Sequence, residues 1–176
     1  MNITLDMLRQ SGLSIDWRSV YVAWRGFDTG IRYERFQIDT DEVVDLARER
    51  LGSGMDAEEE YAIFRLADAE PGRSEDIERF LSRLAERSGV TEARALRKWR
   101  FAHLKWLIRR IDDSPPQDED QVLYDLEALY MFWIYYDALP DTSRAPSVSI
   151  GFELEERERA LREHREWLRE EEALLR

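Results

Sequence analysis

The chain offers few residues that could carry out metal or acid–base chemistry. It contains two histidines, His103 and His164, and no cysteine. Neither histidine has a glutamate three residues before it, because Arg100 and Leu161 occupy those positions. A di-iron carboxylate site in a helical bundle needs that Glu-x-x-His spacing, so that both side chains reach one metal ion. The His-Glu-x-x-His zinc motif is absent as well, and we expect no metal ion and no cofactor.

Motifs for nucleophilic catalysis and phosphate binding are also missing. No serine stands in a Gly-x-Ser-x-Gly turn, which exposes the nucleophile of α/β-hydrolases. The 8 glycines are scattered, and no Gly-x-Gly-x-x-Gly or Walker-type loop is present. His103 lies one helical turn from Trp99 and from Trp106, which favours a half-buried, hydrogen-bonded histidine over a catalytic base. We therefore expect a protein that is not an enzyme.

Carboxylates dominate the charge of the chain. It has 38 acidic and 26 basic residues, and its formal net charge is -12. This charge argues against a nucleic-acid-binding protein, which must neutralise phosphates, and it suits a basic protein partner. Acidic runs are usually solvated helix faces, but two of them are also candidates for a partner-binding surface. The candidate residues are Asp118, Glu119, Asp120, Glu155 and Glu156.

Aromatic residues support a competing hypothesis, which is a small-molecule pocket between helices expected over 92–113 and 120–138. Its candidate residues are Lys105, Trp106 and Tyr130. Aromatic side chains in this number are more typical of a core than of a pocket. For Lys98 and Lys105 we expect stems that pack over aromatic rings and ammonium groups that reach water.

The long segment 96–111 is the element that must position these groups. Its apolar residues fall on two sides of a helix, so it needs neighbours on both sides. Thr91 can cap the helix, and Pro115 and Pro116 prevent its continuation, which predicts a helix over 92–113. The apolar segment that follows, 120–138, is its natural packing partner.

Shorter helices are expected before this long one. The first covers 3–10, and four more end at Gly26, at the turn 52–54, at Pro71 and at Gly89. Between two of them, residues 27–38 alternate loosely and fit either a short strand or a loop. We predict a loop, because a single short strand with no evident partner would leave backbone groups unpaired.

The C-terminal part is expected to be a loop over 141–150 and an amphipathic helix over 152–175. Its leucines recur every seven residues: Leu154, Leu161, Leu168 and Leu175. This spacing predicts a helix that packs along the body of the protein, with a dimer seam as the alternative. A dimer seam needs a second apolar position in each heptad, and here that position is polar, which weakens the dimer hypothesis. The residues at this second seam position are Arg157, His164 and Glu171.

Together these patterns predict an all-α protein. We expect one compact domain over 1–176, with about eight helices stacked as antiparallel pairs. The chain has no run of eighteen apolar residues and no apolar N-terminal segment behind a charged one, so we expect no membrane span and no export. The absence of cysteine fits a reducing compartment, and we expect a cytoplasmic protein.

Three motifs resemble the bacterial family called domain of unknown function 2247. They are Trp17-x-x-Val20-Tyr21-x-Ala23 before a turn with Gly26, Asp41-x-Val43-x-Asp45-x-Ala47, and Arg97-Lys98-Trp99-x-x-Ala102-x-Leu104-Lys105-Trp106. The resemblance covers most of the chain. It implies no established catalytic activity and no catalytic residues to carry over.

The resemblance also bears on function, because the neighbouring genes of some family members point to immunity proteins that act against secreted toxins. Combined with the acidity, it leads us to expect a non-enzymatic protein-interaction domain. The specific hypothesis is an immunity protein that binds and neutralises a basic, nuclease-like toxin. A small-molecule binder or enzyme with the pocket above, and a homo-oligomeric scaffold seamed through 154–175, remain the alternatives.

Overall fold

The structure is a computed structural model that describes residues 3–29, 35–52, 56–69, 74–137 and 145–176. Its helices are α1 (Leu5–Ser11), α2 (Trp17–Arg25), α3 (Thr40–Arg50), α4 (Ala57–Ala67), α5 (Ser74–Arg87), α6 (Glu92–Asp112), α7 (Glu119–Tyr136) and α8 (Leu154–Leu175). The strands are β1 (Phe27–Asp28) and β2 (Arg35–Phe36). The predicted fold, a single helical domain of about eight helices, is confirmed.

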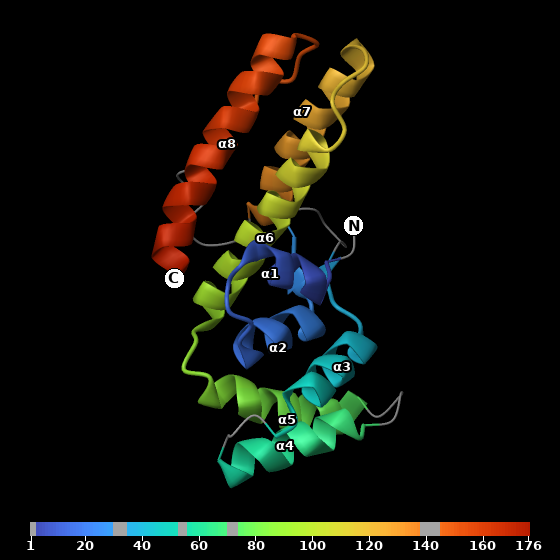
Figure 1. Cartoon of the computed structure of the whole chain (residues 1–176), viewed down its shortest axis with the longest axis vertical. Helices are drawn as coiled ribbons and strands as arrows, with labels where there is room; N and C mark the ends of the chain where they lie inside the picture. Colours follow the sequence, from blue (N-terminus) through green and yellow to red (C-terminus); the bar gives the residue numbers. More distant parts are fainter. Residues whose placement is uncertain (1–2, 30–34, 53–55, 70–73, 138–144) are drawn as a thin grey trace.

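Helix α6 is a long helix that begins near the middle of the molecule and runs to the end where α7 and α8 begin (Figure 1). Helices α1 and α2 pack against it, α8 lies along its length, and α7 packs against its second half. Residues 98–104 of α6 are all buried, and a run of that length covers about two helical turns. The prediction that α6 needs neighbours on both sides therefore holds, and in its middle it is enclosed on every side.

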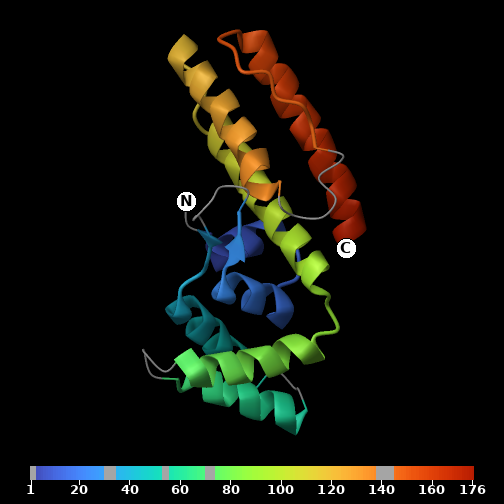
Figure 2. The same cartoon turned by 180° about the vertical axis from the view of Figure 1, so that it is seen from behind.

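Pairs of short helices close the end of the molecule that lies farthest from α7. Helix α4 packs beside α5, while α5 also packs against α2 (Figures 1 and 2). Local signals set their limits: Asp56 caps α4 by accepting hydrogen bonds from the amides of Glu58 and Glu59. The amphipathic face of α5 buries Ile77, Phe80, Leu81 and Leu84.

Polar contacts join α6 to α2 and to the residues just before it. The Trp99 indole donates to the carbonyl oxygen of Ser19 over 2.8 Å. The Lys98 ammonium donates to an Asp16 carboxylate oxygen at 2.7 Å and to the Ser14 carbonyl oxygen at 2.9 Å. The expectation that Lys98 reaches water is therefore wrong. Burial is tolerated because a carboxylate and a carbonyl satisfy the ammonium.

Helix α8 packs along α6 and α7, as the sequence pattern predicts. Three of its seam leucines are buried, and Leu154 is exposed. The polar residues of the second seam position are buried as well, and each has a partner within the chain. Arg157 pairs with Asp125, His164 accepts a hydrogen bond from Trp133, and Glu171 pairs with Arg97.

The segment 27–38 corrects our prediction of a loop, because β1 and β2 form a small antiparallel pair. Phe27 is the partner of Phe36, and their rings lie 5.5 Å apart. Phe36 is 2% exposed and also stacks on Tyr136 at 5.3 Å. The prediction failed because the missing partner strand lies within the same segment. Residues 30–34 lie outside the described residues.

The Asp16–Lys98 pair gives the first testable prediction. Replacing Asp16→Ala leaves a buried ammonium without its carboxylate and removes the cap that the Ser19 amide binds. We expect the free energy of unfolding to fall by about 3–5 kcal/mol, measured by urea denaturation. The matched control is Asp6→Ala, which breaks an exposed ion pair with Arg9 and should change it by less than about 1 kcal/mol. Equal effects of the two substitutions would contradict the prediction.

Candidate functional site

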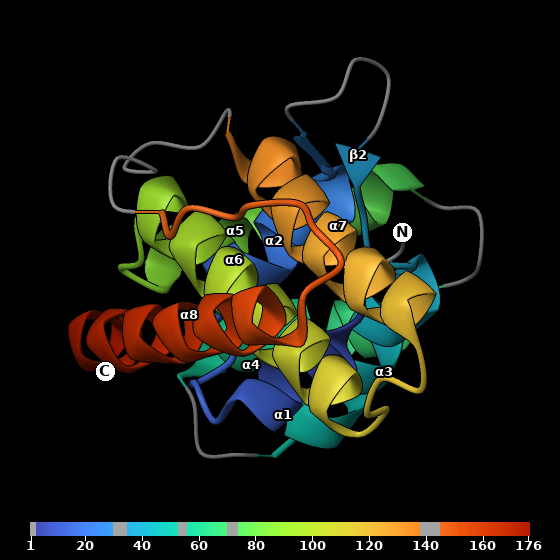
Figure 3. The same ribbon diagram turned by 90° about the horizontal axis from the view of Figure 1, so that it is seen from above.

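The candidate partner-binding carboxylates gather at one end of the molecule. There the loop after α6 meets the first turns of α7 and α8 (Figures 1 and 3). A groove with a volume of about 640 Å³ lies between these segments. Its acidic lining residues are Asp118, Glu119, Glu153 and Glu155, and its apolar ones are Pro116, Val122, Phe152 and Leu154. We call this site the acidic groove.

Local helix chemistry explains why the acids stand at this end. Asp118 caps α7 by accepting a hydrogen bond from the Gln121 amide at 2.9 Å. Glu119 and Asp120 occupy the first turn of α7, and Glu155 and Glu156 occupy the first turn of α8. Negative side chains there interact favourably with the positive end of the helix dipole. Because both helices start at the same end of the molecule, their acidic first turns come together.

The structure brings together three of the five predicted partner-binding residues, which are Asp118, Glu119 and Glu155. Asp120 is exposed nearby but does not line the groove. Glu156 is half-buried, and its carboxylate fills the space that a Cβ atom on Gly151 would occupy. Sequence reasoning missed Glu153, which lies just before α8, although it continues the same acidic run.

The acids of the groove are not neutralised by nearby cations. Within the described ranges, none of Asp118, Glu119, Glu153 and Glu155 forms an ion pair. At the end of α6, by contrast, Asp112 pairs with Arg165 at 2.5 Å. Two large apolar side chains stand among the carboxylates, with Phe152 53% and Leu154 51% exposed. The groove therefore combines excess negative charge with uncovered apolar surface.

A buried polar junction behind the groove sets the positions of α6, α7 and α8. The Arg157 guanidinium donates to Asp125 at 2.7 Å and to the carbonyl oxygen of Ile111 at 3.2 Å. The side-chain amide of Gln121 donates to the other Asp125 oxygen at 2.9 Å. Arg157 of α8 is thus occupied by its contacts to α6 and α7 and cannot neutralise the groove. Removing either partner of a buried ion pair of this kind strongly destabilises the fold, because the other charge is left buried and unpaired.

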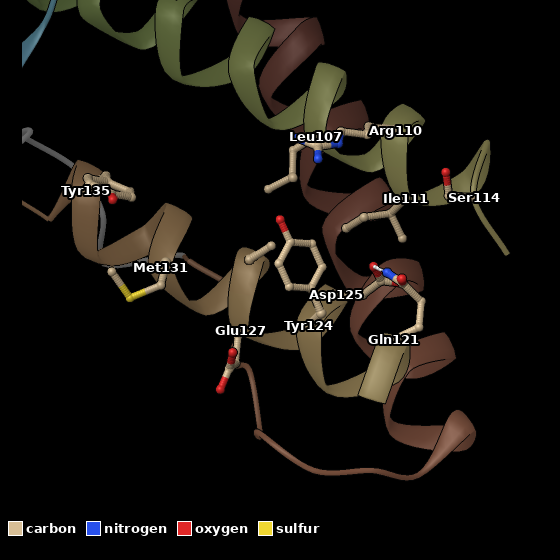
Figure 4. Close-up of a pocket in the computed structure, with 11 residues that line it drawn as sticks. Leu107, Arg110, Ile111, Ser114, Gln121, Tyr124, Asp125, Glu127, Met131 and Tyr135 are labelled. Atoms are coloured by element: carbon tan, nitrogen blue, oxygen red, sulfur yellow. Dashed lines mark hydrogen bonds between the residues drawn. The ribbon is translucent and has the colours of Figure 1, made fainter. Parts of the chain in front are cut away.

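A second opening, of about 400 Å³, lies between α6 and α7, where the competing hypothesis expects a pocket (Figure 4). We call it the α6–α7 pocket. Its lining does not include the residues named from the sequence. Lys105 instead donates to the Ser11 carbonyl oxygen at 2.8 Å, Trp106 packs against His103, and Tyr130 is 42% exposed. Sequence periodicity identified the two helices but not which faces open the pocket.

Both histidines are buried in the core and face neither opening. Burial lowers the pKa of His103 to about 4, and the Nδ1 atom of His103 lies 3.1 Å from the Tyr136 hydroxyl. His103 is 0% exposed, so the expectation of a half-buried side chain underestimated its burial. In His164, Nε2 accepts a hydrogen bond from the Trp133 indole, so Nδ1 must carry the proton. Burial also lowers the pKa of His164.

The described part of the chain has neither a cluster of metal ligands nor a helix that could span a membrane. No group of three or more histidine and carboxylate side chains there is arranged to hold a metal ion. None of the described helices has the length and apolar character needed to cross a bilayer.

Comparison with known proteins gives a family match. The model of the family DUF2247, described as an uncharacterized protein conserved in bacteria, matches residues 5–172. No curated protein and no solved structure matches the chain.

The buried His103 predicts a pH dependence of stability. Its pKa of about 4 in the folded protein lies below the ordinary histidine value of 6.5, so the unfolded chain binds the proton more readily. The contribution of neutral His103 to the free energy of unfolding is complete above pH 6.5. It is lost as the pH falls toward 4, and the whole loss is roughly 3 kcal/mol.

We expect His103→Gln to flatten the decrease in unfolding free energy between pH 7 and pH 5, measured by urea denaturation at each pH. The substitution Glu75→Gln on the exposed surface is the control and should leave the slope unchanged. A His103→Gln protein with the wild-type slope would show that His103 does not titrate in this window.

Proposed function

We propose that this chain, which belongs to the bacterial family DUF2247, is a non-enzymatic protein-interaction domain that binds a basic protein partner. The specific role that we propose is that of an immunity protein, which neutralises a basic, nuclease-like toxin. The observation that carries the proposal is the acidic groove, where unpaired carboxylates surround uncovered apolar side chains in the described part of the chain.

The composition of the groove indicates what the partner must offer. Lysine or arginine side chains would contact Asp118, Glu119, Glu153 and Glu155, and an apolar side chain would cover Phe152 and Leu154. Apolar contacts at the centre and charges at the rim are typical of protein interfaces. Opposite charges raise the rate of association, and the net charge of -12 extends this attraction over the whole molecule.

A nuclease-like toxin suits such a surface, because an active site that binds nucleic acid must be basic to hold phosphates. Carboxylates at the groove can occupy the positions that phosphates would take. The protein would then block the active site without performing any reaction itself, which is consistent with the lack of a catalytic motif in the sequence.

The packing of α8 argues against the alternative hypothesis of a homo-oligomeric scaffold. A dimer seam needs leucines that face outward, but Leu161, Leu168 and Leu175 are buried against the chain's own helices. Leu154 and Leu174 are exposed. Leu154 belongs to the acidic groove, so partner binding would cover it without a second copy of the chain.

Reversing charges in the groove tests the proposal. The double substitution Glu119→Lys and Glu155→Lys should slow association with the partner by about tenfold or more and flatten the dependence of the rate on salt. The partner is first captured on the immobilised wild-type protein from a lysate of the native host. Association rates are then measured by surface plasmon resonance at low and high salt.

The control for this experiment is Glu60→Lys with Glu86→Lys. These residues are exposed on α4 and α5, far from the groove, and they change the net charge by the same amount (Figure 1). If both double variants slow association equally, only the net charge matters and the groove is not the site. If neither does, the partner binds through another surface.

The apolar part of the groove makes a separate prediction. Phe152→Ser should raise the dissociation rate of the complex by about tenfold or more. The partner would bury this ring in the complex, and truncating an aromatic side chain at the centre of an interface removes a large part of the binding free energy. The salt dependence should stay the same, since no charge changes. Leu174→Ser is the control, because it removes an exposed apolar side chain at the opposite end of α8. An unchanged dissociation rate for Phe152→Ser would exclude Phe152 from the interface.

A further inference from the structure

The α6–α7 pocket lies on another face of α7 than the acidic groove. Gln121, Tyr124 and Asp125 line the pocket, whereas Glu119 and Val122 line the groove. On a helix these two sets point in different directions. The pocket is therefore a second opening, separate from the acidic groove of the proposed function.

The walls of the pocket are suited to an apolar, flat molecule. Leu107 and Ile111 on α6 and Ala128 and Met131 on α7 line the pocket and give it apolar walls. Tyr124 and Tyr135 add aromatic rings. Figure 4 shows the Tyr124 ring reaching from α7 across the opening toward α6. A volume of about 400 Å³ is within the range of small-molecule sites.

The small side chain of Ala128 helps to keep this space open. It stands on α7 at the wall of the pocket and is half-buried. A larger side chain at this position would extend into the space between α6 and α7. Replacing Ala128 with a large apolar residue would therefore fill the pocket without changing the polarity of its wall.

The charges around the opening favour an anion. Asp125 is 2% exposed, and Arg157 and Gln121 occupy its two oxygens, so its charge is balanced. Glu127 points away from the opening, while Arg110 lies at the α6 side of it (Figure 4). The Arg110 guanidinium packs over the Trp106 ring at 5.6 Å and forms no ion pair within the described ranges.

We propose that the α6–α7 pocket binds a small aromatic carboxylate. The ring lies on the apolar surface of Leu107, Ile111 and Ala128, beside Tyr124, and the carboxylate pairs with Arg110 at the mouth. A guanidinium can bind a carboxylate with two parallel hydrogen bonds, which gives a planar acid an advantage over a neutral molecule of the same shape. The acidity of the whole protein acts against anions at long range, but salt screens it beyond about 10 Å.

The test uses 2-naphthoate and its neutral analogue naphthalene-2-carboxamide as probes, with binding measured by calorimetry on the full chain. We expect wild-type protein to bind 2-naphthoate about tenfold more tightly than the carboxamide. Arg110→Gln should remove this preference by weakening 2-naphthoate only. The matched control Arg162→Gln removes an exposed arginine of α8 and should leave both affinities unchanged.

The location of binding is tested independently. Ala128→Phe should abolish binding of both probes, with a urea transition that remains cooperative. On the wild-type protein, nuclear Overhauser contacts should connect the naphthoate ring with the Ala128 methyl group and the Tyr124 ring. No binding of 2-naphthoate at millimolar concentration overturns the proposal, and so does binding without these contacts or with an equal loss in Arg110→Gln and Arg162→Gln.

Discussion

The structure depends on one constraint, which is that α6 must be covered on every side. Residues 98–104 are all buried, so no face of the helix can remain in water at its middle. Two of these residues, Lys98 and Arg100, are cations, and buried cations need charged or polar partners. The partners come from opposite directions: Asp16 at the start of α2 pairs with Lys98, and Glu171 near the end of α8 pairs with Arg100. Covering α6 thus brings helices from the N-terminal and the C-terminal parts of the chain onto the same helix.

One end of the molecule is acidic because two helices begin there. The buried cations Lys98, Arg100 and Arg157 each pair with a carboxylate, so these pairs leave the balance of surface charge unchanged. The first turns of α7 and α8 keep their acids because the helix dipoles favour them. Where these turns meet, unpaired carboxylates surround Phe152 and Leu154 in the described part of the chain. The proposed binding surface is a consequence of how the core is built.

Much of the fold could be predicted from local signals. The cap at Thr91 and the two prolines after Ser114 set the limits of α6 within about one residue, and heptad leucines identified the inner face of α8. The β1–β2 pair was missed, because two-residue strands leave almost no periodic signal. The burial of Lys98 was also missed, since its partner Asp16 lies 82 positions away in the sequence. No local rule links two residues at that separation.

The sequence by itself determined that the chain is helical, where most helices begin and end, and that it is acidic and lacks catalytic motifs. These properties follow from neighbouring residues, because caps, breakers and the period of 3.6 residues act within a few positions. Only the tertiary structure decided which acids stay unpaired and which helix faces open into a pocket. Asp118, Glu153 and Glu155 form one groove because α7 and α8 start side by side. That arrangement arises from packing around α6, which depends on contacts between residues far apart in the chain.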